Sequence, residues 1–234
     1  MVYQSVMHAL LNRLFPPHCR LCGVASQTRQ LCQPCRDELP WLAQRCPQCA
    51  CPLHAGGGAS PCGRCQRLVP AFDATHALFH YQPPVDHLLK RLKFSGELAL
   101  GPLLGELLAG QIRQRTDPLP RQLVPVPLHP ARLRERGFNQ ATELARAAGQ
   151  RLGIPLALRL CRRQRNTEPQ SLLSHTARRL NLRNAFTVGG TPAAHVAIVD
   201  DVMTTGHTTH ELARTLRQAG AETVEVWVIA RAGR

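Results

Sequence analysis

The chain has 234 residues, with 29 Lys and Arg against 15 Asp and Glu and a formal net charge of +14. Its longest purely apolar runs are four or five residues, against the roughly 20 that a membrane-spanning helix needs. Residues 1–15 lack the uninterrupted apolar stretch of a secretory signal. We therefore expect a cytoplasmic protein without a membrane span, consisting of one medium domain and a smaller one.

The positive charge is concentrated in one quarter of the chain. Residues 121–183 hold 13 Arg against 3 Glu, a net charge of +10, whereas residues 71–120 are balanced. Such a stripe indicates polyanionic partners, namely phosphate, pyrophosphate or nucleic acid. The preference for Arg over Lys has an alternative explanation in the codon usage of a GC-rich genome.

Nine of the ten cysteines lie between Cys19 and Cys65. A two-residue spacer lets a tight turn aim two thiolates at one tetrahedral ion, and two such pairs complete the ligand shell. We predict two structural Zn²⁺ ions held by consecutive pairs, because pairs that follow each other in the chain close shorter loops. Eight of the cysteines form the CxxC pairs Cys19/Cys22, Cys32/Cys35, Cys46/Cys49 and Cys62/Cys65.

A disulfide framework and a redox-active CxxC are the alternatives to zinc. No export signal supports the first, and four CxxC pairs in tandem are unlike a thioredoxin motif. The stretch also has too few large apolar residues to fold on a core alone. We therefore predict a double zinc ribbon over residues 16–68, with Cys51 and Cys161 outside the metal sites.

After Pro70 the sequence alternates between apolar runs typical of strands and apolar residues at helical spacing. This alternation predicts an α/β domain over residues 71–234 with a mostly parallel sheet. Residues 161–185 are polar, rich in Arg and without a clear period. In chain order, the predicted elements are a strand at 74–81, helices at 85–94 and 98–112, a strand at 123–126, a helix at 140–152, strands at 156–160 and 196–199, a helix at 208–219 and a strand at 223–230.

Two adjacent carboxylates, Asp200 and Asp201, end the predicted strand 196–199. Ligands of open parallel sheets bind at the carboxyl ends of the strands, where the paired acids could hold sugar hydroxyls. The start of the next helix offers free backbone N–H groups to a phosphate. An N-cap alone would need one Thr or Asp rather than the whole series. The residues between the acids and the helix include Thr204, Thr205, Gly206, His207 and Thr208.

These residues resemble a known family. The segment 196–208 looks like the phosphoribosyl-pyrophosphate (PRPP) motif of type I phosphoribosyltransferases. The whole chain after about residue 16 is similar to the ComF (GntX-like) family, in which a double zinc ribbon precedes a phosphoribosyltransferase domain. Further matching positions are Lys93-Phe94, 124–128, 136–140, Gln170, Arg179, Asn181 and Ala185-Phe186.

The resemblance implies roles for several residues of this chain. Asp200 and Asp201 would hold the ribose 2′ and 3′ hydroxyls of PRPP, and residues 204–208 would hold its 5′-phosphate. Mg²⁺ would bridge pyrophosphate and ribose oxygens and keep several waters. The remaining implied positions are Arg132, Arg134 and Arg136 near a pyrophosphate loop, and Gln170 and Arg179 in a flexible loop that closes over the site.

Three functions remain open at this point. The protein would be a phosphoribosyltransferase, whose acceptor no residue pattern indicates; a single-stranded DNA-binding protein that uses zinc ribbons and the Arg stripe; or a non-catalytic PRPP sensor. Only 4% of residues are aromatic, so stacking surfaces for bases are scarce. The resemblance favours a role in DNA uptake or utilisation, with the PRPP site retained and with competence or helicase proteins as partners.

Overall fold

The computed structural model describes residues 18–26, 30–53, 60–165 and 184–233. The chain divides into two compact units, Met1–Pro40 and Trp41–Arg234. The first unit contains the first four CxxC cysteines and a short helix, α2 (Gln33–Asp37). The second contains the other four, helix α3 (Gly63–Arg67) and the sheet. The second cysteine set therefore belongs to the same compact unit as the sheet.

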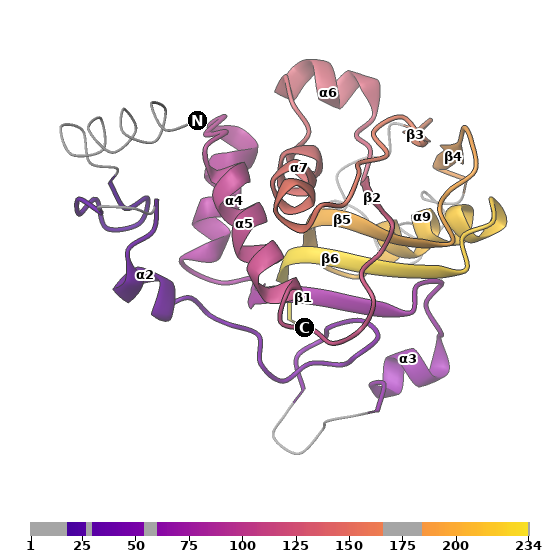
Figure 1. The fold of residues 1–234 in the computed structure, drawn as a ribbon, viewed down its shortest axis with the longest axis horizontal. Helices are drawn as coiled ribbons and strands as arrows, with labels where there is room; N and C mark the ends of the chain where they lie inside the picture. Colours follow the sequence, from indigo (N-terminus) through magenta and orange to yellow (C-terminus); the bar gives the residue numbers. More distant parts are fainter. Residues whose placement is uncertain (1–17, 27–29, 54–59, 166–183, 234) are drawn as a thin grey trace. The chain divides into compact units, whose positions relative to one another are not determined.

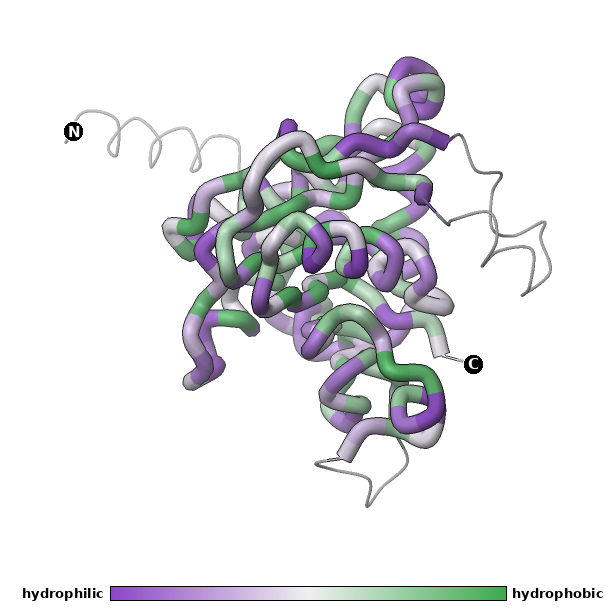
Figure 2. Tube along the Cα trace, turned by 90° about the vertical axis from the view of Figure 1, so that its right-hand side faces the viewer, coloured by the Kyte–Doolittle hydropathy of each residue, from purple (hydrophilic) through white to green (hydrophobic). Residues whose placement is uncertain are grey.

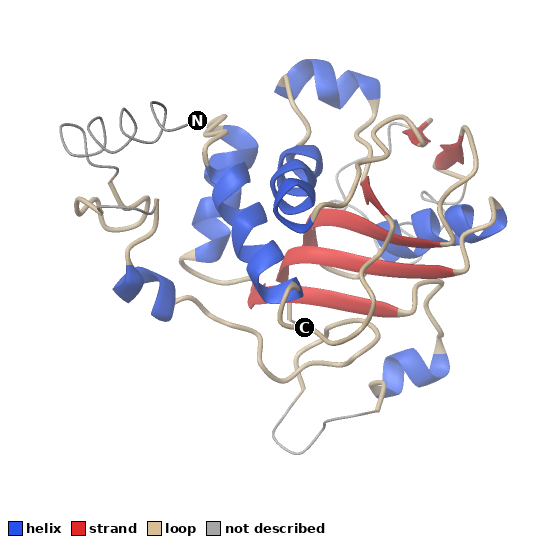
Figure 3. Ribbon diagram, viewed as in Figure 1, coloured by secondary structure: helices blue, strands red, loops and turns tan. Residues whose placement is uncertain are grey.

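The second unit is built on a four-stranded sheet (Figures 1 and 3) with the strand order β1-β6-β5-β2. Every neighbouring pair in this sheet is parallel, so the predicted α/β fold with a mostly parallel sheet is confirmed. Its strands are β1 (Ala74–His80), β2 (Gln122–Pro125), β5 (His195–Met203) and β6 (Thr223–Arg231). Its longer helices are α4 (Val85–Phe94), α5 (Leu100–Ile112), α7 (Gln140–Leu152) and α9 (His207–Gln218).

The two faces of the sheet are covered by different helices (Figure 1). Val196 and Ile198 of β5 belong to one buried cluster with Leu212 of α9. Because side chains alternate along a strand, the intervening residues of β5 point to the other face, which α5 and α7 cover. These two helices approach closely, since a Cβ on Gly105 of α5 would lie 2.6 Å from the backbone oxygen of Leu144.

The strand predicted at 156–160 is wrong. Only Leu156 forms an isolated bridge, to Leu123, and the chain then turns. The extended segment begins later, as β3 (Cys161–Arg163), which pairs antiparallel with β4 (Phe186–Val188) in a separate two-stranded sheet. The apolar run at 156–160 does not form a strand, because the chain turns soon after Leu156, its one paired residue.

Helix α6 (Pro130–Arg136) was not among the predicted elements. It is short and hydrophilic, as its purple tube at the top of Figure 2 shows, so it has no apolar period to detect. Its ends carry signals nonetheless: Pro130 occupies the first turn, and Gly137 ends the helix with φ of 79°. Within the described ranges, no helix has both the length and the apolar character needed to cross a bilayer.

Candidate functional site

The CxxC cysteines gather into two tetrads, and each tetrad joins consecutive pairs. In each set the four sulfur atoms lie within 4.8 Å of one another. The Sγ atoms of Cys22 and Cys32 are 3.7 Å apart, as are those of Cys49 and Cys62. Four thiolates at roughly 2.3 Å from a tetrahedral Zn²⁺ lie roughly 3.8 Å from each other. The geometry therefore fits one structural zinc per tetrad, and the predicted pairing is confirmed. The tetrads are Cys19, Cys22, Cys32 and Cys35, and Cys46, Cys49, Cys62 and Cys65.

The thiol pKa values reflect the crowding of sulfur atoms. Burial opposes ionisation of Cys19 and Cys62, yet backbone hydrogen bonds lower their pKa values to about 6 and about 7. Burial and the neighbouring thiols raise the pKa of Cys65 instead. A divalent cation would remove this conflict, because it stabilises all four thiolates at once. Cys161, by contrast, is a buried residue at the start of β3, where burial raises its pKa to about 12.

The two carboxylates predicted to bind a ligand lie near the carboxyl end of β5. Strand β2 is the parallel neighbour of β5, so the segment after β2 reaches the same edge of the sheet. The backbone N–H of Val126 donates to the oxygen of Val199 at 2.9 Å, which holds this segment beside Asp200. Helix α6 follows, and its Arg132 and Arg136 border the same space as the acids.

Asp200 and Asp201 have different electrostatic environments. The Oδ2 atom of Asp201 forms an ion pair with Nζ of Lys93 at 2.6 Å, and its Oδ1 accepts from the N–H of Val202. Burial and the neighbouring charge of Asp201 raise the pKa of Asp200 to about 7. Burial opposes the charge of Lys93, but both carboxylates outweigh it and raise the pKa of Lys93. At neutral pH, Asp200 is therefore poised between donating and accepting a proton in hydrogen bonds.

A cavity of about 520 Å³ surrounds this acid pair. Four cationic side chains line it together with the two acids and Thr208 of α9. Burial and the charge of Arg132 lower the pKa of Arg163 on β3. Several cations that line one cavity favour the binding of an anion there. The cationic residues are Lys93, Arg132, Arg136 and Arg163.

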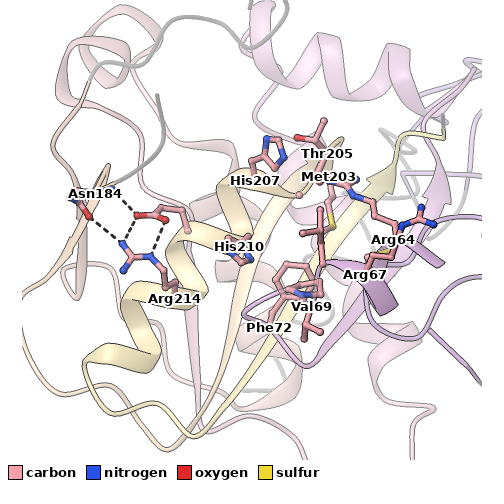
Figure 4. Close-up of a pocket in the computed structure, with 15 residues that line it drawn as sticks. Arg64, Arg67, Val69, Phe72, Asn184, Met203, Thr205, His207, His210 and Arg214 are labelled. Atoms are coloured by element: carbon pink, nitrogen blue, oxygen red, sulfur yellow. Dashed lines mark hydrogen bonds and ion pairs between the residues drawn. The ribbon is translucent and has the colours of Figure 1, made fainter. Parts of the chain in front are cut away.

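The other residues predicted to bind phosphate are divided between two sides of the loop. Thr205, Gly206 and His207 line a second cavity, of about 660 Å³, between the loop and helices α3 and α9. In Figure 4, Thr205 and His207 lie at one end of this cavity, with Arg64 and Arg67 on one side and Arg214 on the other. The hydroxyl of Thr205 is buried there and has no hydrogen-bond partner among the residues that the structure describes.

Two of the predicted positions line neither cavity. Thr204 and Arg134 are exposed and line neither space. Gln170 and Arg179 lie outside the described residues. The structure thus brings Asp200, Asp201, Thr208, Arg132 and Arg136 to one cavity.

The second tetrad is hydrogen-bonded to the loop that follows β5. Arg64, inside the last CxxC pair, donates from Nη2 to the backbone oxygen of Thr205 at 3.0 Å. Arg231 of β6 is buried and donates to the oxygens of both Cys49 and Met203, at 2.9 and 3.0 Å. Hydrogen bonds from two arginine side chains therefore connect the second tetrad to the loop that follows β5.

Sequence reasoning gave no role to Lys93, Arg64 or Arg231, and Arg163 was noted only as part of a charged run. Lys93 and Phe94 were visible as positions that match the ComF family. The spacer residue Arg64 carries no signal at all in the sequence, because its partner is 141 residues away. Only the tertiary structure joins such distant segments.

Comparison with known proteins shows which family the chain belongs to. Residues 10–66 match the model of the double zinc ribbon domain family. The chain is 36% identical to DNA utilization protein YhgH of Salmonella typhi, over 92% of this chain and 97% of that protein. It is 35% identical to competence protein F of Haemophilus influenzae, over 92% of this chain and 90% of that protein.

Among solved structures, the chain is similar to adenine phosphoribosyltransferase from Leishmania tarentolae, with 15% identity and a TM-score of 0.40 over 70% of this chain and 93% of that one. The match to each of the two bacterial relatives covers 92% of this chain. The chain therefore belongs to the ComF (GntX-like) family, and its N-terminal part is a double zinc ribbon.

Proposed function

We propose that this protein binds PRPP or a related sugar phosphate in the cavity of Asp200 and Asp201, and that it serves DNA uptake or utilisation in the cytoplasm. The observation that carries the proposal is the pairing of two adjacent acids with clustered arginines in one cavity at the carboxyl end of β5. Sugar hydroxyls need strong acceptors, and phosphates need cations, so a sugar phosphate requires both in one place.

The ligand's parts can be assigned to different residues. The ribose hydroxyls would be held by Asp200 and Asp201, because carboxylates form charge-assisted hydrogen bonds that an amide cannot match. Pyrophosphate oxygens would be held by Arg132 and Arg163, which line the same cavity. The 5′-phosphate would approach Thr208 in the first turn of α9, because the N-terminus of a helix favours an anion.

Magnesium fits this donor set, because Mg²⁺ prefers carboxylate, phosphate and water oxygens. Bound with PRPP, it would neutralise charge on the pyrophosphate leaving group. The protein's own contribution to pentosyl transfer would be positioning the ribose and supplying fixed positive charge beside that leaving group. Lys93 holds Asp201 at 2.6 Å and so fixes the orientation of one of the two ribose acceptors.

A role in DNA uptake or utilisation follows from the relatives. DNA utilization protein YhgH and competence protein F match this chain across nearly its whole length. A net charge of +14 favours association with nucleic acid through phosphates. Competence or helicase proteins that act on the same DNA are the expected partners.

Calorimetry tests the sugar-phosphate site. The full chain would be titrated at pH 8, where Asp200 is ionised, with PRPP and Mg²⁺ and separately with ribose 5-phosphate. Asp200→Asn should weaken PRPP binding roughly 10- to 100-fold, because a charged acceptor is lost. The matched control is Asp86→Asn, which removes a carboxylate that pairs with Lys90 on α4. Equal PRPP affinities for wild type and Asp200→Asn, or no binding by wild type, would refute the proposal.

Single-stranded nucleic-acid binding is a second candidate, favoured by the cavity between α3 and α9. Arg64 and Arg67 line one side and Arg214 the other, and Leu68 and Val69 beside them are 64% and 70% exposed. Cationic and apolar groups together suit a strand's phosphates and bases. If these arginines contact the strand's phosphates, the logarithm of the binding constant should fall linearly with the logarithm of the salt concentration.

The slope of this salt dependence shows which region of the protein contacts the single strand. Replacing Arg64 and Arg67 by Ala should lower the slope by roughly 1.4 if both contact phosphates of a single strand. The parallel variant replaces Arg162, Arg163 and Arg165 in the Arg stripe. A slope unaffected by either set of changes would mean that neither region meets nucleic acid.

A further inference from the structure

Arg231, the last residue of β6, is a charged residue enclosed by the fold. It is 2% exposed, and among the described residues no carboxylate forms an ion pair with it. Its hydrogen-bond partners there are backbone oxygens. Nε donates to the oxygen of Cys49 at 2.9 Å. Nη1 donates to the oxygens of Met203 and Ala232, at 3.0 and 2.7 Å, and to that of Thr204. A buried cation is costly unless an anion compensates it, so this guanidinium needs a counter-ion.

The second tetrad supplies such an anion when it binds zinc. Four thiolates bring more negative charge than Zn²⁺ can neutralise, so the filled tetrad carries a net negative charge. Cys46, Cys49 and Cys65 are buried, so water screens this charge only weakly. The oxygen that accepts from Nε of Arg231 belongs to Cys49, one of the four ligands. Arg231 is therefore placed to compensate part of the charge of the metal centre.

The same guanidinium holds the loop that joins β5 to α9. Met203 ends β5 and Thr204 follows it, and the backbone oxygens of both accept from Arg231. The next residue adds a bond, because the N–H of Ala232 donates to the oxygen of Met203 at 3.1 Å. Asp201, just before Met203, lines the cavity of the acid pair. A shift of Arg231 would therefore move the backbone that follows the acids.

Met203 in turn contacts the start of α9. Gly206, with φ of 78°, packs so closely that a Cβ there would lie 2.6 Å from Cε of Met203. The oxygen of Gly206 accepts from the hydroxyl of Thr209 at 3.0 Å and from the N–H of His210 at 2.9 Å. Thr208, which lines the cavity of the acid pair, lies in this first turn. Contacts therefore run without a break from the second tetrad to a residue of that cavity.

We propose that Arg231 is the counter-ion of the zinc centre in the second tetrad and the residue that positions the loop after β5 for the sugar phosphate. Zinc in this tetrad would then raise the affinity of the cavity for its ligand, because both favour the same arrangement of Arg231 and the loop. Arg231 is a positioning residue, since it lines neither cavity. The positioning role rests on the proposed function, whereas the counter-ion role rests on Arg231 and the tetrad alone.

Zinc affinity tests the counter-ion role without any sugar phosphate. The full chain would compete for zinc with a chromophoric chelator. Cys62→Ser and Cys19→Ser each keep one tetrad intact, so they assign the two affinities to the two sites. Arg231→Met keeps the bulk of the side chain but removes its charge. It should lower the zinc affinity of the second tetrad roughly tenfold or more, because charge-assisted contacts are lost, and should leave the first tetrad within about twofold of wild type.

Two further variants separate charge from general destabilisation. Arg231→Lys keeps the charge, but its single nitrogen cannot take the places of both Nε and Nη1. It should keep the zinc affinity within about threefold of wild type. The matched control is Arg217→Met, because Arg217 also donates to backbone oxygens, those of Ala71 and Glu222, away from the tetrad and the loop. It should bind zinc as wild type does.

PRPP binding tests the positioning role. Zinc-loaded wild type, Arg231→Met, Arg231→Lys and Cys62→Ser would be titrated with PRPP and Mg²⁺ in a calorimeter. Each variant should bind PRPP roughly 5- to 150-fold more weakly, the usual range for coupling between two sites. Arg231→Met combined with Cys62→Ser should lose no more than the weaker-binding single variant, because both changes break the same connection. Arg217→Met should bind PRPP as wild type does.

The outcomes separate this inference from the proposed function. Wild-type zinc affinity in Arg231→Met, an equal loss in Arg217→Met, or a loss in Arg231→Lys as large as that in Arg231→Met overturns the counter-ion role. If wild type binds PRPP and the Arg231 variants bind it equally well, the positioning role is overturned and the sugar-phosphate site stands. If wild type does not bind PRPP, the proposed function and the positioning role fail together, and zinc affinity alone decides the counter-ion role. If Arg231→Met does not fold, Arg231→Lys still decides both roles: retained zinc with weakened PRPP supports them, and any other result overturns one of them.

Discussion

Nη2 of Arg64 and the backbone oxygen of Thr205 are 3.0 Å apart and form a hydrogen bond. Arg64 lies between two cysteines of the second tetrad, and Thr205 lies in the loop between β5 and α9. Arg231 adds a second connection, because it donates to the oxygens of Cys49 and Met203. The conformation of the loop therefore depends on the second tetrad, because two arginine side chains connect them by hydrogen bonds.

Loss of the second zinc site should loosen this loop. In Cys62→Ser, the amides of residues 203–210 should exchange with solvent roughly fivefold faster or more, because about 1 kcal/mol of hydrogen bonding is lost. Cys19→Ser is the matched control, since it disrupts the tetrad of the other compact unit. Hydrogen exchange measured by mass spectrometry checks the prediction, and equal exchange in both variants would contradict it.

The purified protein should contain about two Zn²⁺ per chain, one for each tetrad. Elemental analysis should find one ion fewer in Cys19→Ser and in Cys62→Ser, and no change in Cys51→Ser or Cys161→Ser. The reason is that each tetrad supplies four ligands, so the loss of one opens the shell. Protein prepared without chelator that contains no zinc would disprove both metal sites.

Asp200→Asn should stabilise the protein, and the gain should grow with pH. The pKa of Asp200 rises from an ordinary value near 3.8 to about 7 in the fold, chiefly through burial. Between these pH values the folded state binds more protons than the unfolded state, so this group lowers the free energy of unfolding as pH rises. Asn cannot ionise. The thermal midpoint of Asp200→Asn should match wild type near pH 4 and exceed it at pH 8; a gap independent of pH would be inconsistent with the raised pKa.

Asp201→Asn should destabilise the protein. It leaves the ammonium of Lys93 largely buried without the carboxylate that stands 2.6 Å away, at a cost on the order of 3 kcal/mol. The double variant Lys93→Met with Asp201→Asn should recover most of that loss, because no unpaired charge remains. Chemical denaturation of the single and double variants measures the coupling. Additive losses in the double variant would show that the ion pair contributes nothing.

Local sequence patterns predicted the parts of this protein whose causes are local. The tetrads follow from CxxC pairs only a few residues apart, because short loops close at low entropy cost. Strand β5 and helix α9 follow from a buried apolar run and a helical period, and the acids at the strand end mark the ligand edge of the sheet. Helix α6 and strand β3 escaped prediction because short polar segments carry no apolar period, and β4 has only three residues.

The sequence by itself determined the two metal sites, the parallel sheet and the position of the acid pair. Only the tertiary structure decided which cations face those acids, because Lys93, Arg132 and Arg163 come from three segments that meet in space. It also divided the predicted phosphate loop between two cavities, with Thr208 on one side and Thr205 and His207 on the other. Side-chain direction in a loop depends on the backbone turn and on what packs against it. Residues such as Arg64, far away along the chain, supply that packing.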